Sequence, residues 1–234
     1  MNSFSEAAGQ TFSLLASADA KLVDIVLLSL RMSITAALIG GVIGLPLGAV
    51  IAVNEFRGRR TLIVILNALM GLPSVVVGLL VYLLLSRAGP LGSWGILFTP
   101  TAIIIAQTIL IMPTLAALSR QVIGDAWHEY REQLRSLGET KLGAAPTLLW
   151  DLKFSLVTIV LAGFGRAISE VGAVMIVGGN IDGVTRVMTT TIALETSKGD
   201  LPLALGLGFI LLFIVLALNA AAYVVNDTAQ RRYG

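Results

Sequence analysis

The sequence contains no cysteine, a single histidine (His128) and few charged residues. The missing cysteines exclude a disulfide framework and any cysteine-based metal or redox site, and one histidine excludes a histidine-rich metal site. Charged residues make up 13% of the chain and apolar residues 56%, whereas a soluble domain has roughly 25% charged residues. Together with a mean hydropathy of +0.89, this composition predicts an all-α integral membrane protein.

Five stretches are long and apolar enough to cross a membrane as helices. About 20 helical residues span the roughly 30 Å of hydrocarbon in a bilayer. Four stretches are free of Asp, Glu, Lys and Arg over most of their length, and the fifth contains Arg166 and Glu170. A kink is expected in the second, where Gly71 and Pro73 interrupt it. Transmembrane helices are predicted at about 22–53, 61–86, 101–118, 154–178 and 202–226.

The distribution of Lys and Arg predicts the orientation of the chain. Connections on the cytoplasmic side of a membrane protein carry an excess of these residues. Five helices and the observed bias both place the N-terminus outside and the C-terminus in the cytoplasm. The four cationic residues on the outer side are Lys21, Arg87, Arg186 and Lys198, and the ten on the cytoplasmic side are Arg57, Arg59, Arg60, Arg120, Arg131, Arg135, Lys141, Lys153, Arg231 and Arg232.

The chain length allows one membrane domain, residues 1–234, without a sizeable second domain. No cleavable signal sequence is expected in residues 1–20, because they lack a basic start and a compact apolar core. The phosphate-binding pattern G-x-x-x-x-G-K-[ST] is absent, so this chain is not expected to hydrolyse ATP by that means.

The longest cytoplasmic connection, residues 120–153, has a helical pattern of its own. Asp125 can cap a helix, and apolar residues recur along one face of it until Gly138, which is expected to end it. The apolar face either rests on the protein's own helices or the lipid surface, or docks into a groove on a soluble partner. The residues of this face are Trp127, Tyr130, Leu134 and Leu137.

Residues 132–138, Glu-Gln-Leu-Arg-Ser-Leu-Gly, resemble the EAA loop of ABC importer permeases. Glu132, Leu137 and Gly138 hold the places of that motif, whereas Gln133 and Leu134 replace its two alanines. The position before the penultimate transmembrane helix also fits. The resemblance implies that 120–153 is a coupling loop that inserts into an ATPase subunit through Tyr130, Glu132, Leu134, Leu137 and Gly138.

A second stretch resembles the sulfate, molybdate and tungstate permeases of this class. It comprises Arg-Ala-Ile-Ser-Glu-Val-Gly-Ala at 166–173, Gly-Gly-Asn at 178–180, Thr-Arg at 185–186 and Ile-Ala-Leu-Glu at 192–195. Residues 169–200 are most similar to the tungstate-specific members of the family. The resemblance covers about 28–219.

The resemblance implies a non-enzymatic permease subunit that translocates tungstate by alternating access. It implies a homodimer, two ATPase subunits that bind ATP and Mg, and an extracytoplasmic oxyanion-binding protein that delivers the substrate. This chain would then hold no cofactor. Molybdate or sulfate remains the alternative substrate. A passive anion channel is the alternative from another class, and an intramembrane enzyme is disfavoured because no catalytic set is visible.

Two charged residues lie within the fourth predicted span. Arg166 and Glu170 are four residues apart and therefore share one face of a continuous helix. They either form a structural ion pair or line the pathway, where Arg166 attracts a dianion and Glu170 tempers that attraction. Asn180 and Arg186 are further candidates for the pathway. Arg31, in the first span, is explained by snorkelling toward the outer interface.

The segment after the fourth span predicts a short external helix at about 185–197. The glycines at 178–179 end the span, Asp182 and Gly183 form a turn, and Asp200 caps the last span. This segment is expected to meet the binding protein or to dip toward the pathway, unless it is an ordinary surface helix. The threonines at 189–191 offer hydroxyl donors to an oxyanion or, more commonly, bond to their own backbone.

Overall fold

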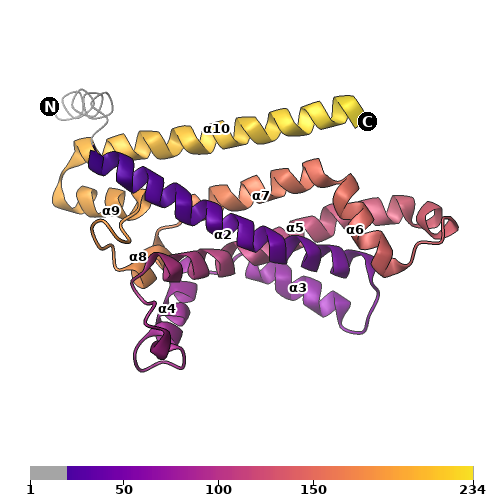
Figure 1. The fold of residues 1–234 in the computed structure, drawn as a ribbon, viewed down its shortest axis with the longest axis horizontal. Coiled ribbons are helices and arrows are strands. Elements are labelled where there is room, and N and C mark those ends of the chain that lie inside the picture. Colours follow the sequence, from indigo (N-terminus) through magenta and orange to yellow (C-terminus); the bar gives the residue numbers. More distant parts are fainter. Residues whose placement is uncertain (1–19, 234) are drawn as a thin grey trace. The chain divides into compact units, whose positions relative to one another are not determined.

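The computed structural model describes residues 20–233, and these residues form helices and no strands. Residues 1–19, for which no signal sequence was expected, lie outside the described part. The helices are shown in Figure 1 in chain order. Their bounds are α2 (Ala20–Val53), α3 (Arg59–Leu69), α4 (Ser74–Leu85), the short 3-10 helix η1 (Gly92–Trp94), α5 (Pro100–Ser136), α6 (Lys141–Asp151), α7 (Lys153–Ile168), α8 (Gly172–Gly178), α9 (Met188–Lys198) and α10 (Leu201–Tyr233).

Three of these helices, α2, α5 and α10, are long and apolar enough to cross a membrane alone. Two further spans result if α3 is counted with α4 and α6 with α7, because each pair is apolar but interrupted at a short break. The described residues therefore contain three to five candidate spans. The prediction of an all-helical fold is confirmed for these residues, and their apolar helices are long enough to cross a bilayer several times.

The interruption expected in the second span at Gly71 and Pro73 is confirmed, and it is a full break instead of a kink, because α3 and α4 meet at a bend of 99°. The chain leaves the helix after Leu69 and resumes it at Ser74. Pro73 has no amide hydrogen, and it disfavours helical geometry for Leu72 before it. Gly71, the least helix-favouring residue after proline, adds to the interruption.

The helix predicted at 101–118 is wrong in extent, because α5 continues without interruption to Ser136. Asp125 lies inside α5 and does not begin a new helix. No proline lies between 118 and 136, and Gly124 alone costs only about 1 kcal/mol in a helix. The amphipathic segment of the predicted coupling loop is therefore the last part of a membrane-length helix.

The prediction of one helix at 154–178 is wrong at 169–171. Helix α7 ends at Ile168 and α8 begins at Gly172. The Ala173 amide donates to the Glu170 carboxylate, and the Thr189 hydroxyl donates to the Glu170 carbonyl. These bonds replace helical ones at the break. Before α7, the unpredicted helix α6 meets it at a bend of 78°.

The helices form two compact units. The first contains 20–35, Pro73–Gln107 and Ile168–Ala217, and the second contains Ala36–Leu72, Thr108–Ala167 and 218–233.

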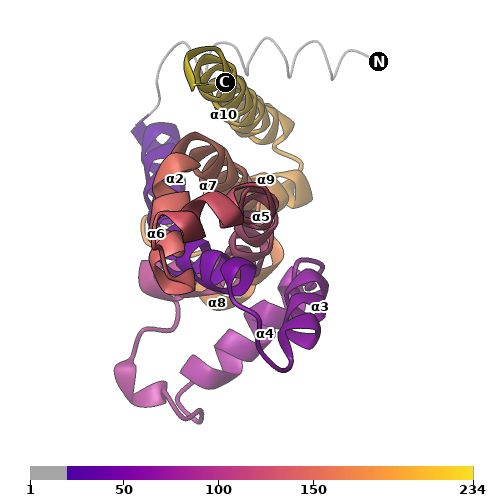
Figure 2. The same ribbon diagram turned by 90° about the vertical axis from the view of Figure 1, so that its right-hand side faces the viewer.

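In the second unit, small residues allow α2, α5 and α7 to pack closely (Figure 2). A Cβ added to Gly48 of α2 would lie 2.5 Å from the carbonyl oxygen of Ala116 in α5. One added to Gly163 of α7 would lie 2.7 Å from Leu115 Cδ2. Leu115 and Ala116 are fully buried. These glycines serve close helix contact, as glycines do at membrane helix interfaces.

In the first unit, α4 packs against α8 (Figure 1). A Cβ on Gly78 of α4 would lie 2.7 Å from the Cα of Ala173 in α8. At that distance no side chain fits between the two backbones. Helix α8 has only seven residues, so it depends on this contact for its place in the unit.

Candidate functional site

The turn after α5 ends the helix as the sequence predicts. Gly138 has φ +84°, a left-handed conformation that glycine adopts at little cost. The Leu137 amide donates to the Gln133 carbonyl over 3.2 Å, and the Glu139 amide donates to the Leu134 carbonyl over 3.0 Å. These bonds satisfy the last carbonyls of the helix, as in a glycine-ended C-terminus. The turn thus has a defined backbone.

The other side of the turn is capped as well. The Thr140 side chain accepts a hydrogen bond of 3.0 Å from the Gly143 amide at the start of α6. This cap was not predicted, although a threonine three residues before a glycine-alanine run is a typical helix start. Residues 138–140 therefore connect two helix ends whose backbone bonds are satisfied.

The predicted coupling residues lie around this turn. Leu137 is 74% exposed, and the side chains of Tyr130 and Glu132 are also exposed, whereas Leu134 is half-buried. Single exposed apolar side chains are common on proteins, so it is the position of Leu137 beside the turn that makes it a candidate for contact with a partner. The structure therefore brings these residues to one end of α5, with Leu137 the most prominent apolar group.

Trp150, near the end of α6, is a second exposed apolar group that the sequence analysis did not assign. The ammonium nitrogen of Lys153 lies 4.8 Å from the centroid of its ring. Such a cation–aromatic contact contributes about 0.5–1 kcal/mol at an exposed site. The spacing of tryptophan and lysine at i and i+3 is the sequence signal for this contact.

Arg166 and Glu170 do not share the face of one helix, because α7 ends between them at Ile168. Arg166 is exposed in the last turn of α7. The Glu170 carboxylate accepts the Ala173 amide over 3.1 Å, and thereby caps the start of α8. Glu170 thus has a local structural role that the sequence did not reveal.

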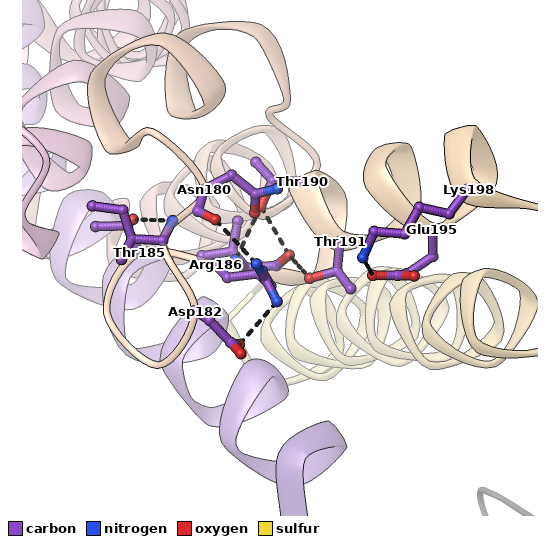
Figure 3. Close-up of polar contacts among 10 residues, drawn as sticks. Asn180, Asp182, Thr185, Arg186, Thr190, Thr191, Glu195 and Lys198 are labelled. Carbon is purple, nitrogen blue, oxygen red and sulfur yellow. Dashed lines mark hydrogen bonds and ion pairs between the residues drawn. The ribbon is translucent and has the colours of Figure 1, made fainter. Parts of the chain in front are cut away.

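Asn180 and Arg186, the other two predicted pathway residues, do lie together (Figure 3). The Arg186 Nη2 donates to the Asn180 carbonyl over 3.5 Å, and Nη1 pairs with the Asp182 carboxylate at 2.9 Å. The loop is fixed by Thr185, whose hydroxyl donates to the Gly178 carbonyl and accepts the Ile181 amide. The sequence placed Asp182 in a turn but did not predict this ion pair.

A short helix after the fourth span is confirmed, although it begins at Met188 instead of 185, and its place outside the membrane stays a prediction. Asp200 accepts the Leu203 amide over 3.3 Å and caps α10, as predicted. The hydroxyls of Thr190 and Thr191 donate to the Val187 carbonyl. Together with Thr189, they serve the backbone and are not offered to a ligand. Within 20–233, no group of three or more His, Cys, Asp or Glu residues could hold a metal ion.

Comparisons with known proteins support the membrane-transport interpretation. Residues 44–234 match the family described as "Binding-protein-dependent transport system inner membrane component". The chain is 44% identical to a tungstate uptake system permease protein of Peptoclostridium acidaminophilum over 92% of this chain and 94% of that protein. It is 39% identical to a probable anion ABC transporter permease protein of Haloferax volcanii, over 91% and 94% of the two chains.

A more distant relative is the sulfate transport system permease protein of Escherichia coli, 28% identical over 88% of this chain and 76% of that protein. The family match covers most of the chain, and the candidate spans agree with it. The chain therefore belongs to the inner membrane components of binding-protein-dependent transport systems, the permeases of ABC transporters.

Proposed function

We propose that this chain is the membrane subunit of an ATP-driven importer for tungstate. The similarity to a tungstate uptake permease over nearly the full length of both chains carries the choice of substrate. Molybdate and sulfate are the second candidates, because sulfate permeases are also related. All three are tetrahedral dianions, so a pathway suited to one differs little from a pathway suited to another.

Energy enters through residues 120–153, which form the coupling segment of a single permease domain, residues 1–234. A separate ATPase subunit, which holds ATP and Mg, docks onto Tyr130, Glu132, Leu134, Leu137 and Gly138. The exposure of Leu137 beside a turn of defined backbone supports this role. An exposed apolar group next to a rigid turn fits into a groove on a partner with little loss of conformational entropy.

The full transporter contains two copies of this chain, two ATPase subunits below them and an oxyanion-binding protein outside. Helix α10 leaves much of its apolar surface uncovered within the chain, which supports contact with lipid and a second copy. The N-terminus lies outside and the C-terminus in the cytoplasm, in agreement with the distribution of Lys and Arg. Arg166, Glu170, Asn180 and Arg186 belong to the pathway side, which alternates between outward-facing and inward-facing states.

The test is tungstate uptake by proteoliposomes that contain this chain, its ATPase and the binding protein, with and without ATP. Leu137→Ala is expected to reduce ATP-dependent uptake. Trp94→Ala, which shortens another exposed apolar side chain far along the chain from the turn, is the matched control and is expected to leave it unchanged. Flux that is independent of ATP and equal in both variants would identify a passive anion channel. Uptake of sulfate or molybdate in place of tungstate would reassign the substrate.

A further inference from the structure

The first unit contains a charged cavity of about 840 Å³. Its wall is formed by α2, the loop before α9, α9 itself and the start of α10. Four basic side chains from three of these regions line it: Lys21 and Arg31 from α2, Arg186 from the loop and Lys198 from α9. Such a convergence of cations on one hollow is the arrangement that binds an anionic group.

Arg186 is held in this wall by two contacts that leave some of its N–H donors unused. Its side chain is 21% exposed, held by the Asp182 carboxylate and the Asn180 carbonyl (Figure 3). Its Nε is buried without a hydrogen-bond partner among the described residues. A guanidinium group has five N–H donors, and Nη1 and Nη2 each keep one beyond these two contacts, whereas the buried Nε is out of reach of a ligand. Asp182 is 68% exposed, so its ion pair with Arg186 is weak, and an incoming anion can compete for the guanidinium.

Arg31 faces the same cavity, and no described residue forms an ion pair with its guanidinium. Snorkelling explains why an arginine tolerates a place near the end of a span. It does not explain why Arg31 lines the same cavity as the guanidinium group of Arg186. Asp182 offsets the charge of Arg186, whereas no described carboxylate pairs with Arg31, and each guanidinium presents a flat set of donors suited to oxyanions.

Three of the four acidic side chains of the cavity already have partners, and two of those partners are the cavity's own cations Arg186 and Lys198. Asp182 pairs with Arg186, Glu195 accepts Lys198 at 2.8 Å, and Asp200 caps α10. Their charges, with that of Asp24, nonetheless balance the four cations. A balanced lining lowers the affinity for an anion, which a transport pathway needs so that a bound ion can leave.

We infer that this cavity binds a tetrahedral oxyanion group between Arg31 and Arg186, with Lys21 and Lys198 adding attraction. Two sources supply that chemistry: the free transported dianion, and the phosphate of a lipid headgroup. For the lipid, Leu27 and Leu28 line the cavity beside Arg31 and offer apolar contact to an acyl chain. The first source rests on the proposed function, and the second does not.

The experiment measures binding to the purified complex of this chain with its ATPase, without ATP. Tungstate binding is measured by equilibrium dialysis in an uncharged detergent. Lipid binding is measured by native mass spectrometry after exchange into phosphatidylglycerol or phosphatidylcholine. The variants are Arg31→Gln and Arg186→Gln. The matched control is Arg87→Gln, an exposed arginine outside the cavity.

Each cavity variant is expected to weaken binding of the true ligand about tenfold, as the loss of a charged hydrogen bond does, and the control is expected to change nothing. Loss of tungstate binding identifies the free dianion. Loss of phosphatidylglycerol binding with unchanged tungstate binding identifies the lipid phosphate. Arg31→Gln removes no described side-chain interaction, so its effect is not one of misfolding. If both cavity variants match Arg87→Gln in both assays, the inference is overturned, whatever the uptake experiment shows about transport.

Discussion

The backbone of Gly138 gives a quantitative test of the coupling turn. A Cβ added there would meet no atom within 4 Å, so a substitution brings no steric clash with its surroundings. The cost comes from φ +84° alone, and a non-glycine residue in the left-handed region loses about 1–2 kcal/mol. The free chain can relax its turn and avoid this strain, whereas the ATPase is expected to bind only the left-handed turn. Gly138→Ala is therefore expected to weaken ATPase binding by about 5-fold to 30-fold, which corresponds to that free energy.

Two variants separate this backbone effect from other causes. Gly138→Asn is expected to lose less affinity, because asparagine enters the left-handed region more readily than alanine. Gly124→Ala places the same methyl group in open space within α5, and it is expected to leave ATPase binding unchanged. The measurement is the Kd between purified permease and ATPase, followed by ATP-dependent uptake. Equal affinities for Gly138→Ala, Gly138→Asn and Gly124→Ala would refute the reasoning.

Three further variants test the packing and capping. Gly78→Ala forces α4 and α8 apart at Ala173 and is expected to destabilise the fold by the roughly 1–3 kcal/mol typical of overpacking. The unfolding temperature in detergent should fall, and an unchanged temperature contradicts the close contact. Thr189→Val removes the donor to the Glu170 carbonyl and is expected to lower the free energy of unfolding by about 1–3 kcal/mol. Amide hydrogen exchange at 169–173 is expected to become faster, and exchange like that of the wild type argues against this bond. Asp200→Ala removes the cap of α10 and is expected to lower the free energy of unfolding by about 0.5–2 kcal/mol, which is measured as a lower unfolding temperature. Asp200→Asn keeps the cap and serves as the control.

Apolar length predicted where the long helices lie, and Gly71 and Pro73 predicted the interruption of the second span, but nothing predicted the break at 169–171. The starts of the first and last spans agree with the prediction within two residues, because α2 and α10 are apolar over most of their length and Asp200 marks the start of α10. The break at 169–171 depends on the Thr189 hydroxyl, which is distant in sequence. No periodicity within 154–178 reveals such a partner. The continuation of α5 to Ser136 contains Arg120 and Asp125, so apolar length alone does not predict it.

The candidate site was predicted unevenly for a similar reason. Gly138 ends its helix through local backbone geometry, which a single glycine after an amphipathic run predicts well. The pairing of Arg166 with Glu170 assumed an unbroken helix and failed with it. The neighbourhood of Arg31 and Arg186 was not predictable, because the two residues are far apart in the sequence and come together only when the first unit folds.

The interruption between α7 and α8 also bears on how the chain enters the membrane during synthesis. An unpaired backbone carbonyl in hydrocarbon costs several kcal/mol, so a broken span is stable only when protein groups complete it. The Glu170 carbonyl is completed by Thr189, which leaves the ribosome only after another 18 residues have been added to the chain. Helices such as α2 can partition into lipid as soon as they emerge. The segment around Glu170 must wait for α9, so its integration is a step of tertiary folding and not of hydrophobic partitioning alone.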